Sequence, residues 1–216
     1  MKKYSHIIFD LDGTLTDPGT GITNSVMYAL EKYGIKAVRS ELYKFIGPPL
    51  RESFRIYYGF DETMAEHAVS LYREYFSVKG IYENELYPGI PELLESLKQS
   101  GRKLYIATSK PAEYSLRILD HFGIAKYFDH VAGSNMDGTM SEKNSLIERI
   151  LSRIDSRQTA LTVMVGDRRY DIEGAKAHGL DSVAVAYGYG GLRELEGSGP
   201  TFIVETTEKL GVLLIG

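Results

Sequence analysis

The sequence predicts an α/β fold with a doubly wound, mostly parallel sheet and one inserted, all-helical segment. Short apolar runs of strand length alternate with amphipathic helical patterns over most of the chain, which is typical of parallel sheets with right-handed crossovers. Between residues 18 and 84 this alternation stops, and only helical patterns occur. We therefore expect an α/β core of residues 1–17 and 85–216, interrupted by a helical cap of residues 18–84.

The core prediction rests on five apolar runs separated by helical stripes. The runs lie at residues 7–9, 104–107, 130–132, 160–165 and 182–185. Continuous apolar runs of this length indicate strands that are buried on both faces. The helical stripes between them lie around residues 90–97, 118–122, 146–154 and 172–175. Leu210 to Ile215 is expected to be a packed last turn.

The cap prediction rests on two apolar stripes at helical spacing. They are Ile22, Val26, Ala29, Leu30 and Tyr33, and then Met64, Ala68, Leu71, Tyr72, Tyr75 and Phe76. Between them, Gly47-Pro48-Pro49-Leu50-Arg51 is expected to be a rigid turn, because Pro-Pro fits neither a helix interior nor a central strand. Two interpretations of this turn stay open: Gly47 and Arg51 face a substrate, or the turn is structural and Arg51 lies on a helix surface.

Composition excludes several classes of protein. The 216 residues are 43% hydrophobic and 25% charged, with a net charge of -4. This charge gives no broad basic face for a nucleic acid polymer or an anionic membrane. No run approaches the roughly 18 apolar residues of a membrane helix. Because cysteine is absent, disulfides and a thiol nucleophile are excluded, and the expected location is a reducing cytoplasm.

Carboxylates follow the first and fourth apolar runs. Asp10 and Asp12 come directly after residues 7–9, and Asp167 and Asp171 follow residues 160–165. Open α/β sheets bind ligands at the carboxyl ends of their strands. Asp-Gly turns are common, but two such ends with four carboxylates are better explained as one site. Clustered carboxylates repel one another, and Mg²⁺ is the cation that suits a few carboxylates and a phosphate.

The run Asp10-Leu11-Asp12-Gly13-Thr14-Leu15 resembles the first signature of the haloacid dehalogenase superfamily of aspartate-nucleophile phosphatases. The resemblance spans most of the chain and implies a Rossmann-like core with a cap that selects the substrate. It also implies that Asp10 is the nucleophile, and that Asp12 is the general acid and then the general base. Mg²⁺ would be held by the side chains of Asp10 and Asp167 and the backbone carbonyl of Asp12, with Asp171 behind them.

A hydroxyl and a lysine complete the expected site. Thr108 follows the second run, where its hydroxyl and nearby N–H groups could hold a phosphate oxygen, with Ser109 beside it; a helix N-cap is the alternative. The superfamily places a lysine after the third strand, typically before proline. Lys143 fits that position although Asn144 follows it. Lys110 is its rival, and a solvated surface lysine is the alternative for both.

These residues predict a Mg²⁺-dependent phosphatase that acts on small phosphate monoesters through an aspartyl-phosphate. The start of the cap is most similar to the phosphoglycolate phosphatase and 5'-nucleotidase branch, so phosphoglycolate or a nucleoside 5'-monophosphate is the expected substrate. A sugar phosphomutase keeps both Asp10 and Asp12 and is one alternative. A phospho-acceptor signalling module is another, although Asp12 and the cap argue against it. No oligomeric state is predicted.

Overall fold

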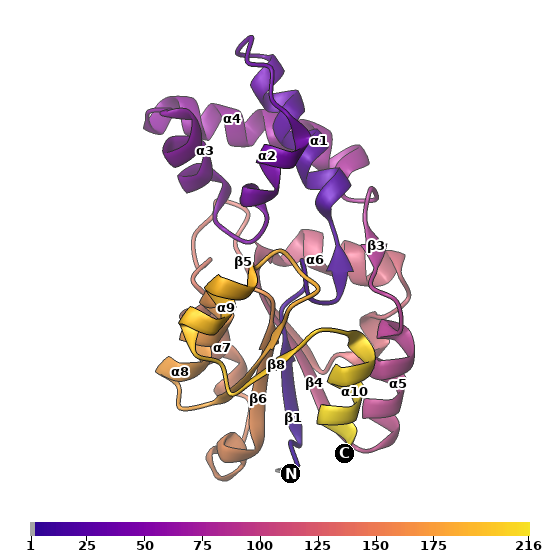
Figure 1. The fold of residues 1–216 in the computed structure, drawn as a ribbon. Coiled ribbons are helices and arrows are strands. Elements are labelled where there is room, and N and C mark those ends of the chain that lie inside the picture. Colours follow the sequence, from indigo (N-terminus) through magenta and orange to yellow (C-terminus); the bar gives the residue numbers. More distant parts are fainter. Residues whose placement is uncertain (1–2) are drawn as a thin grey trace. The chain divides into compact units, whose positions relative to one another are not determined.

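The computed structural model describes residues 3–216, which fall into two compact units (Figure 1). The first unit is Met1–Thr16 with Leu86–Gly216, and the second is Asp17–Glu85. Two short strands, β2 (Thr16–Asp17) and β3 (Glu85–Leu86), pair with each other where the chain passes between the units.

The first unit contains a six-stranded sheet in the order β5-β4-β1-β6-β7-β8, and every neighbouring pair is parallel. The predicted fold class is therefore confirmed. The strands are β1 (His6–Phe9), β4 (Lys103–Pro111), β5 (His130–Ser134), β6 (Thr162–Gly166), β7 (Asp181–Val185) and β8 (Phe202–Val204). The chain reverses its direction of travel across the sheet beside β1, and such switch points form ligand crevices at the carboxyl ends of the strands.

Helices connect the strands. They are α5 (Ile90–Gln99), α6 (Ala112–His121), α7 (Lys143–Leu151), α8 (Arg169–Ala177), α9 (Leu192–Ser198) and α10 (Thr207–Ile215), with short 3-10 turns at Ala125–Tyr127 and Ser156–Leu161. The 3-10 turn at Ser156–Leu161 occupies the first two residues of the predicted strand 160–165, so β6 begins at Thr162 instead.

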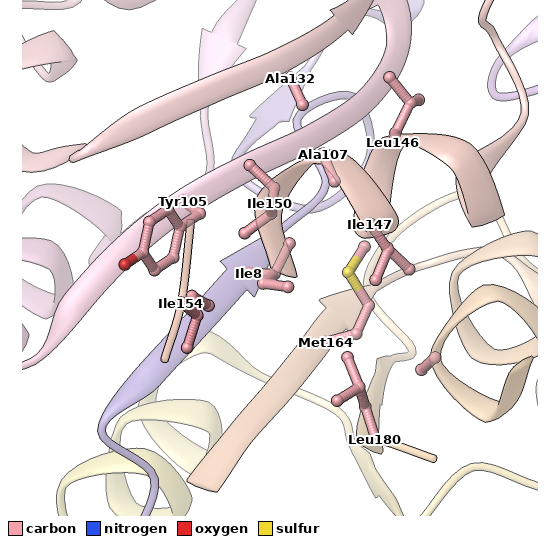
Figure 2. Packing of buried hydrophobic residues seen from close by; sticks show 11 residues of the cluster. Ile8, Tyr105, Ala107, Ala132, Leu146, Ile147, Ile150, Ile154, Met164 and Leu180 are labelled. Atoms are coloured by element: carbon pink, nitrogen blue, oxygen red, sulfur yellow. The ribbon is translucent and has the colours of Figure 1, made fainter. Parts of the chain in front are cut away.

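The buried face of α7 explains where the core lies. Leu146, Ile147 and Ile150 are fully buried and pack towards Ile8 of β1 and Met164 of β6 (Figure 2). Burying each such side chain contributes about 1.5–3 kcal/mol. Truncating Ile147 to Ala would therefore cost about 2–5 kcal/mol through the lost contacts and the cavity. This packing also fixes the first residue of α7, which is Lys143.

The second unit is helical except for its ends. It contains α1 (Gly19–Glu31), α2 (Arg39–Leu42), α3 (Leu50–Tyr58) and α4 (Glu62–Tyr75), with a 3-10 turn at Tyr43–Phe45 and a π-helical turn at Phe76–Gly80. The helices α1 and α4 were expected from their stripes and α2 was not, whereas a helix at Arg51 was one of the two interpretations left open. Proline at position 49 precedes α3, so Arg51 lies in the first turn of a helix. Among the described residues, no helix is long and apolar enough to cross a membrane.

Candidate active site

Three buried carboxylates meet at the carboxyl ends of β1 and β6. Asp10 directly follows β1, and its N–H donates to the carbonyl of Val165 at 2.9 Å. The pairing of Phe9 with Val165 brings the ends of the two strands level. Carboxylate oxygens of Asp10, Asp167 and Asp171 all lie within 4.8 Å of one another. Each of these side chains is almost fully shielded from solvent, so their charges interact strongly.

Lys143 lies among these carboxylates. Its Nζ is 2.9 Å from Oδ1 of Asp10 and 2.7 Å from Oδ1 of Asp171, and it donates to the carbonyl of Ala107 at 2.9 Å. Burial alone would lower the pKa of Lys143, but the two carboxylates raise that pKa above its usual value. The lysine is therefore positively charged at neutral pH.

Asp167 is held by groups from two different segments. Its Oδ2 accepts the backbone N–H of Tyr189 at 2.8 Å, and its Oδ1 accepts the hydroxyl of Thr14 at 3.3 Å. Burial raises the pKa of Asp167 well above the usual aspartate value, and the negative charges of Asp10 and Asp171 raise it further. In the absence of a cation, this site therefore resists ionising all three carboxylates.

The residues fit a divalent cation. Three carboxylates against the single ammonium of Lys143 leave two negative charges, which one divalent ion would cancel. The available ligands are carboxylate oxygens, which hard cations such as Mg²⁺ prefer. The set that lies together is Asp10, Asp167 and Asp171, and Asp171 already pairs with Lys143.

Asp12 projects from a tight turn and pairs with the other candidate lysine. Gly13 takes a left-handed φ of 83°, which lets the chain turn sharply after Asp12. Nζ of Lys110 lies 2.8 Å from Oδ2 of Asp12, and both side chains are buried. Oδ1 of Asp12 is buried with no hydrogen-bond partner in the described part of the chain. Burial raises the pKa of Asp12, and Lys110 opposes that shift.

The structure separates the two lysines by their partners. Lys143 contacts Asp10 and Asp171, whereas Lys110 contacts Asp12. The alternative that these lysines are solvated surface residues is wrong for both, because each side chain is only 5–6% exposed.

Thr108 and Ser109 lie within β4, beside a bulge that follows Thr108. The N-cap of α6 is Pro111, so the alternative that Thr108 caps the helix is wrong. Thr108 is buried, and its Oγ1 accepts the N–H of Lys110 at 3.3 Å. The hydroxyl of Ser109 donates to the carbonyl of Ser141 at 2.8 Å, so it ties β4 to the loop before α7.

Gly47 and Arg51 belong to the helical unit. Gly47 takes a φ of 102°, so the turn needs glycine there. The guanidinium of Arg51 lies 3.5 Å from Glu62 and 3.2 Å from Glu66, both on α4. These exposed ion pairs connect α3 to α4, and each contributes little to stability.

The loop after β7 also contacts the site, although none of its residues was predicted. Its residues Tyr187 and Tyr189 contact the turn after Asp12 and the carboxylate of Asp167. One signal could have identified it: Tyr187-Gly188-Tyr189-Gly190-Gly191 is a glycine-rich run directly after a predicted strand, and backbone approaches a site closely where glycines cluster.

The family described as haloacid dehalogenase-like hydrolase matches residues 7–185. The chain belongs to this family. The predicted superfamily is thereby confirmed, and the chain is an enzyme, a hydrolase of the phosphatase type within that family.

This hydrolase is similar to other proteins over most of its length. A Pseudomonas aeruginosa protein named 5'-nucleotidase is 46% identical over 202 residues, which is 92% of this chain and 90% of that one. A Mycobacterium tuberculosis protein named tyrosine-protein kinase PtkA is 39% identical over 213 residues, which is 95% of this chain and 72% of that one. The crystal structure of a predicted phosphatase from Clostridium acetobutylicum superposes with a TM-score of 0.93 at 45% identity, covering 99% of each chain.

Proposed function

We propose that this hydrolase is a Mg²⁺-dependent phosphatase that cleaves small phosphate monoesters through an aspartyl-phosphate on Asp10. One observation carries the proposal: the oxygens of Asp10, Asp167 and Asp171 lie within 4.8 Å of one another, and Nζ of Lys143 is 2.9 Å from Asp10. A carboxylate nucleophile can attack an anionic phosphate only where positive charge offsets the repulsion, and this cluster combines a lysine with ligands for a cation.

In the proposed reaction, a carboxylate oxygen of Asp10 attacks phosphorus, and the bond from phosphorus to the ester oxygen breaks. Asp12 gives its proton to that ester oxygen, so the product leaves as a neutral alcohol. Asp12 then takes a proton from water, whose oxygen attacks phosphorus. The bond between phosphorus and Asp10 breaks, which releases inorganic phosphate and restores the free carboxylate.

The remaining residues of the site would bind the cation and the phosphate and orient them towards Asp10. Mg²⁺ held by Asp10, Asp167 and the carbonyl of Asp12 would offset the charge of the phosphate and the nucleophile. Lys143 adds a second positive charge beside Asp10, and Asp171 holds that lysine at 2.7 Å. The buried hydroxyl of Thr108 would donate to a phosphate oxygen.

Among small monoesters, we propose a nucleoside 5'-monophosphate first and phosphoglycolate second. The first choice is supported by the relative named 5'-nucleotidase, which is 46% identical over nearly the whole chain. The helical unit, with Gly47 and Arg51, would select between these substrates. We propose no polymeric nucleic acid and no membrane as a partner. We also propose a cytoplasmic location, with which the cysteine-free sequence agrees and which cell fractionation would check.

Phosphate release from a panel of esters tests the proposal. The panel contains nucleoside 5'-monophosphates, phosphoglycolate and sugar phosphates, each assayed with Mg²⁺ and again with EDTA. We expect many turnovers with Mg²⁺ and none with EDTA, because the carboxylate cluster repels the phosphate without a cation. Ca²⁺ should inhibit, since its larger and looser coordination shell misplaces the nucleophile. Full turnover in EDTA would refute the requirement for Mg²⁺. If no ester in the panel releases phosphate, the proposed phosphatase activity is refuted.

The same panel separates the alternatives. A phospho-acceptor signalling module would release one equivalent of the alcohol, keep the phosphoryl group on its aspartate and stop, whereas a sugar phosphomutase would isomerise its substrate. Because one relative is named a tyrosine-protein kinase, the panel should also include ATP labelled on its γ-phosphate with a tyrosine peptide as acceptor. Label transfer to the peptide faster than release into water would favour a phosphotransferase.

A further inference from the structure

We propose that Tyr187 and Gly188, in the loop between β7 and α9, are positioning residues that hold Asp167 against the turn that follows Asp12. This inference rests on the proposed function, because Asp167 matters there as a ligand of Mg²⁺. Neither residue contacts the reacting atoms in the proposed chemistry. Their effect would be to fix the distance between the acidic ends of β1 and β6.

The loop holds the carboxylate of Asp167 through its backbone. The N–H of Tyr189 donates to Oδ2 at 2.8 Å, while the hydroxyl of Thr14 donates to Oδ1 at 3.3 Å. The two oxygens are thus oriented from two segments, one after β7 and one after β1. Groups that orient a metal-binding carboxylate in this way set the geometry that the metal meets.

Position 188 needs glycine because there is no room for a side chain there, and not because of its backbone conformation. A Cβ atom added at Gly188 would lie 2.3 Å from the carbonyl oxygen of Gly13 and 2.4 Å from Cβ of Asp167. Both distances are too short for real atoms, and neither neighbour is the end of a flexible side chain. Gly188 is not among the glycines with positive φ, so alanine would fit its backbone. A methyl group at this position must therefore displace Gly13, Asp167 or the loop that contacts them both.

Tyr187 contacts the same turn through its side chain. Its hydroxyl donates to the carbonyl of Thr14 at 2.9 Å. Its ring packs on the ring of Tyr87, with centroids 4.8 Å apart. The N–H of Tyr87 in turn donates to the carbonyl of Leu15 at 3.1 Å. Burial raises the pKa of the Tyr187 hydroxyl, so it stays a protonated donor over the working range of the enzyme.

Gly191 provides a matched control in the same loop. A Cβ atom added at Gly191 meets nothing within 4 Å, and its φ is -66°. Gly191→Ala therefore makes the same chemical change as Gly188→Ala, three residues away, without the collision. Any effect of an alanine on loop entropy is shared by both variants, so a difference between them reports the contact with Asp167 and Gly13.

The experiment measures Mg²⁺ affinity of the full chain by titration calorimetry, together with phosphate release. We expect Gly188→Ala to bind Mg²⁺ about 10–100-fold more weakly than wild type, and Gly191→Ala to stay within about twofold. Equal affinities for Gly188→Ala and wild type would overturn the inference alone, and the proposed function would stand. If wild type itself binds no Mg²⁺, the proposed function fails and the inference fails with it.

Tyr187→Phe decides the matter if Gly188→Ala does not fold. This variant removes one hydroxyl and keeps the ring against Tyr87. We expect thermal unfolding in EDTA close to that of wild type, about tenfold weaker Mg²⁺ binding, and a lower kcat with an unchanged KM for the ester. A merely structural role would lower the unfolding temperature and leave the Mg²⁺ affinity of the folded protein unchanged. A lower unfolding temperature with unchanged Mg²⁺ affinity would overturn the inference. So would a Mg²⁺ affinity and an unfolding temperature that both equal those of wild type.

Discussion

Nζ of Lys143 lies 2.9 Å from Oδ1 of Asp10. The lysine begins α7, whereas the aspartate directly follows β1, so the packing of α7 on the sheet determines this distance. Asp10 thus approaches a phosphate with a positive charge already beside it. Because the pair is buried, no water has to reorganise when the charge on the nucleophile changes.

Lys143→Ala should damage the chemistry more than Lys110→Ala. Losing a preorganised charge partner costs on the order of 10²–10³ in rate, and Lys143 is the lysine that contacts the nucleophile. Steady-state phosphate release from the best ester measures both variants, with circular dichroism as the control for folding. A larger loss for Lys110→Ala would show that the pair with Asp12 is the more important of the two.

Asp10→Asn should abolish turnover and leave the fold intact. The amide has nearly the same shape, but it cannot attack phosphorus and is a poorer ligand for Mg²⁺. Its unfolding transition should resemble that of wild type, since the substitution removes one charge from a cluster of three carboxylates. Activity above about one per cent of wild type is far more than the loss of a covalent nucleophile should leave, and it would contradict the role of Asp10.

Asp12→Ala should discriminate between leaving groups. An alkyl phosphate needs a proton on its departing oxygen, whereas p-nitrophenolate scarcely does, so kcat should fall much further for the alkyl ester. The two rates are compared at saturating substrate in one buffer. Equal losses on both esters would mean that Asp12 acts through the turn or through Lys110, 2.8 Å away, and not as the acid.

Arg51→Ala tests recognition by the helical unit. If Arg51 contacts the non-reacting end of the substrate, kcat/KM should fall for the best natural ester and stay the same for p-nitrophenyl phosphate. Its ion pairs with Glu62 and Glu66 predict only a small change in stability. If kcat/KM falls by the same factor for both substrates, Arg51 contributes to the packing of α3 on α4 and not to substrate recognition.

Asp129 should make stability depend on pH at the opposite end of the sheet. Burial acts to raise its pKa, but Lys98 at 2.8 Å, Lys103 at 3.0 Å and the N–H of Leu104 lower it below the usual value. Because the folded pKa is the lower one, the ionised group stabilises the fold above the unfolded pKa of about 4. This contribution is lost as the pH falls through the folded pKa.

Asp129→Asn keeps an oxygen for Leu104 but removes the charge. We expect it to lower the free energy of unfolding by about 1 kcal/mol at pH 7, with the difference from wild type shrinking towards pH 3. Urea unfolding at several pH values measures this difference. A deficit that does not change with pH would mean that the loss comes from packing or from the hydrogen bond, not from the charge.

The sequence predicted the parts of the fold that are buried on both faces. The strands β1, β4, β5, β6 and β7 are apolar because helices cover them, so they can be recognised from composition alone. Of the elements that were not predicted, β8 lacks that signal, because it has three residues and only Val204 is buried. The helix α3 does carry a signal, since Leu50, Phe54, Tyr57 and Tyr58 recur at helical spacing.

The carboxylates of the site were predictable because they follow strands that could be recognised. The contact between Lys110 and Asp12 was not predictable. Lys110 follows Thr108 at an irregularity in β4, and this irregularity has no sequence signal. The N–H of Tyr189 was equally hidden, because a backbone donor is present at every residue except proline.

The pairing of β2 with β3 means that the chain leaves the first unit and re-enters it at neighbouring points. The segment between them, Asp17–Glu85, is thus a module whose two ends are already adjacent. Such insertions are exchangeable, because a replacement must span only the gap between two neighbouring strands. Residues 17–85 could be swapped for the corresponding segment of another family member, or replaced by a short glycine-containing linker, while β1 and β4 keep their places in the sheet.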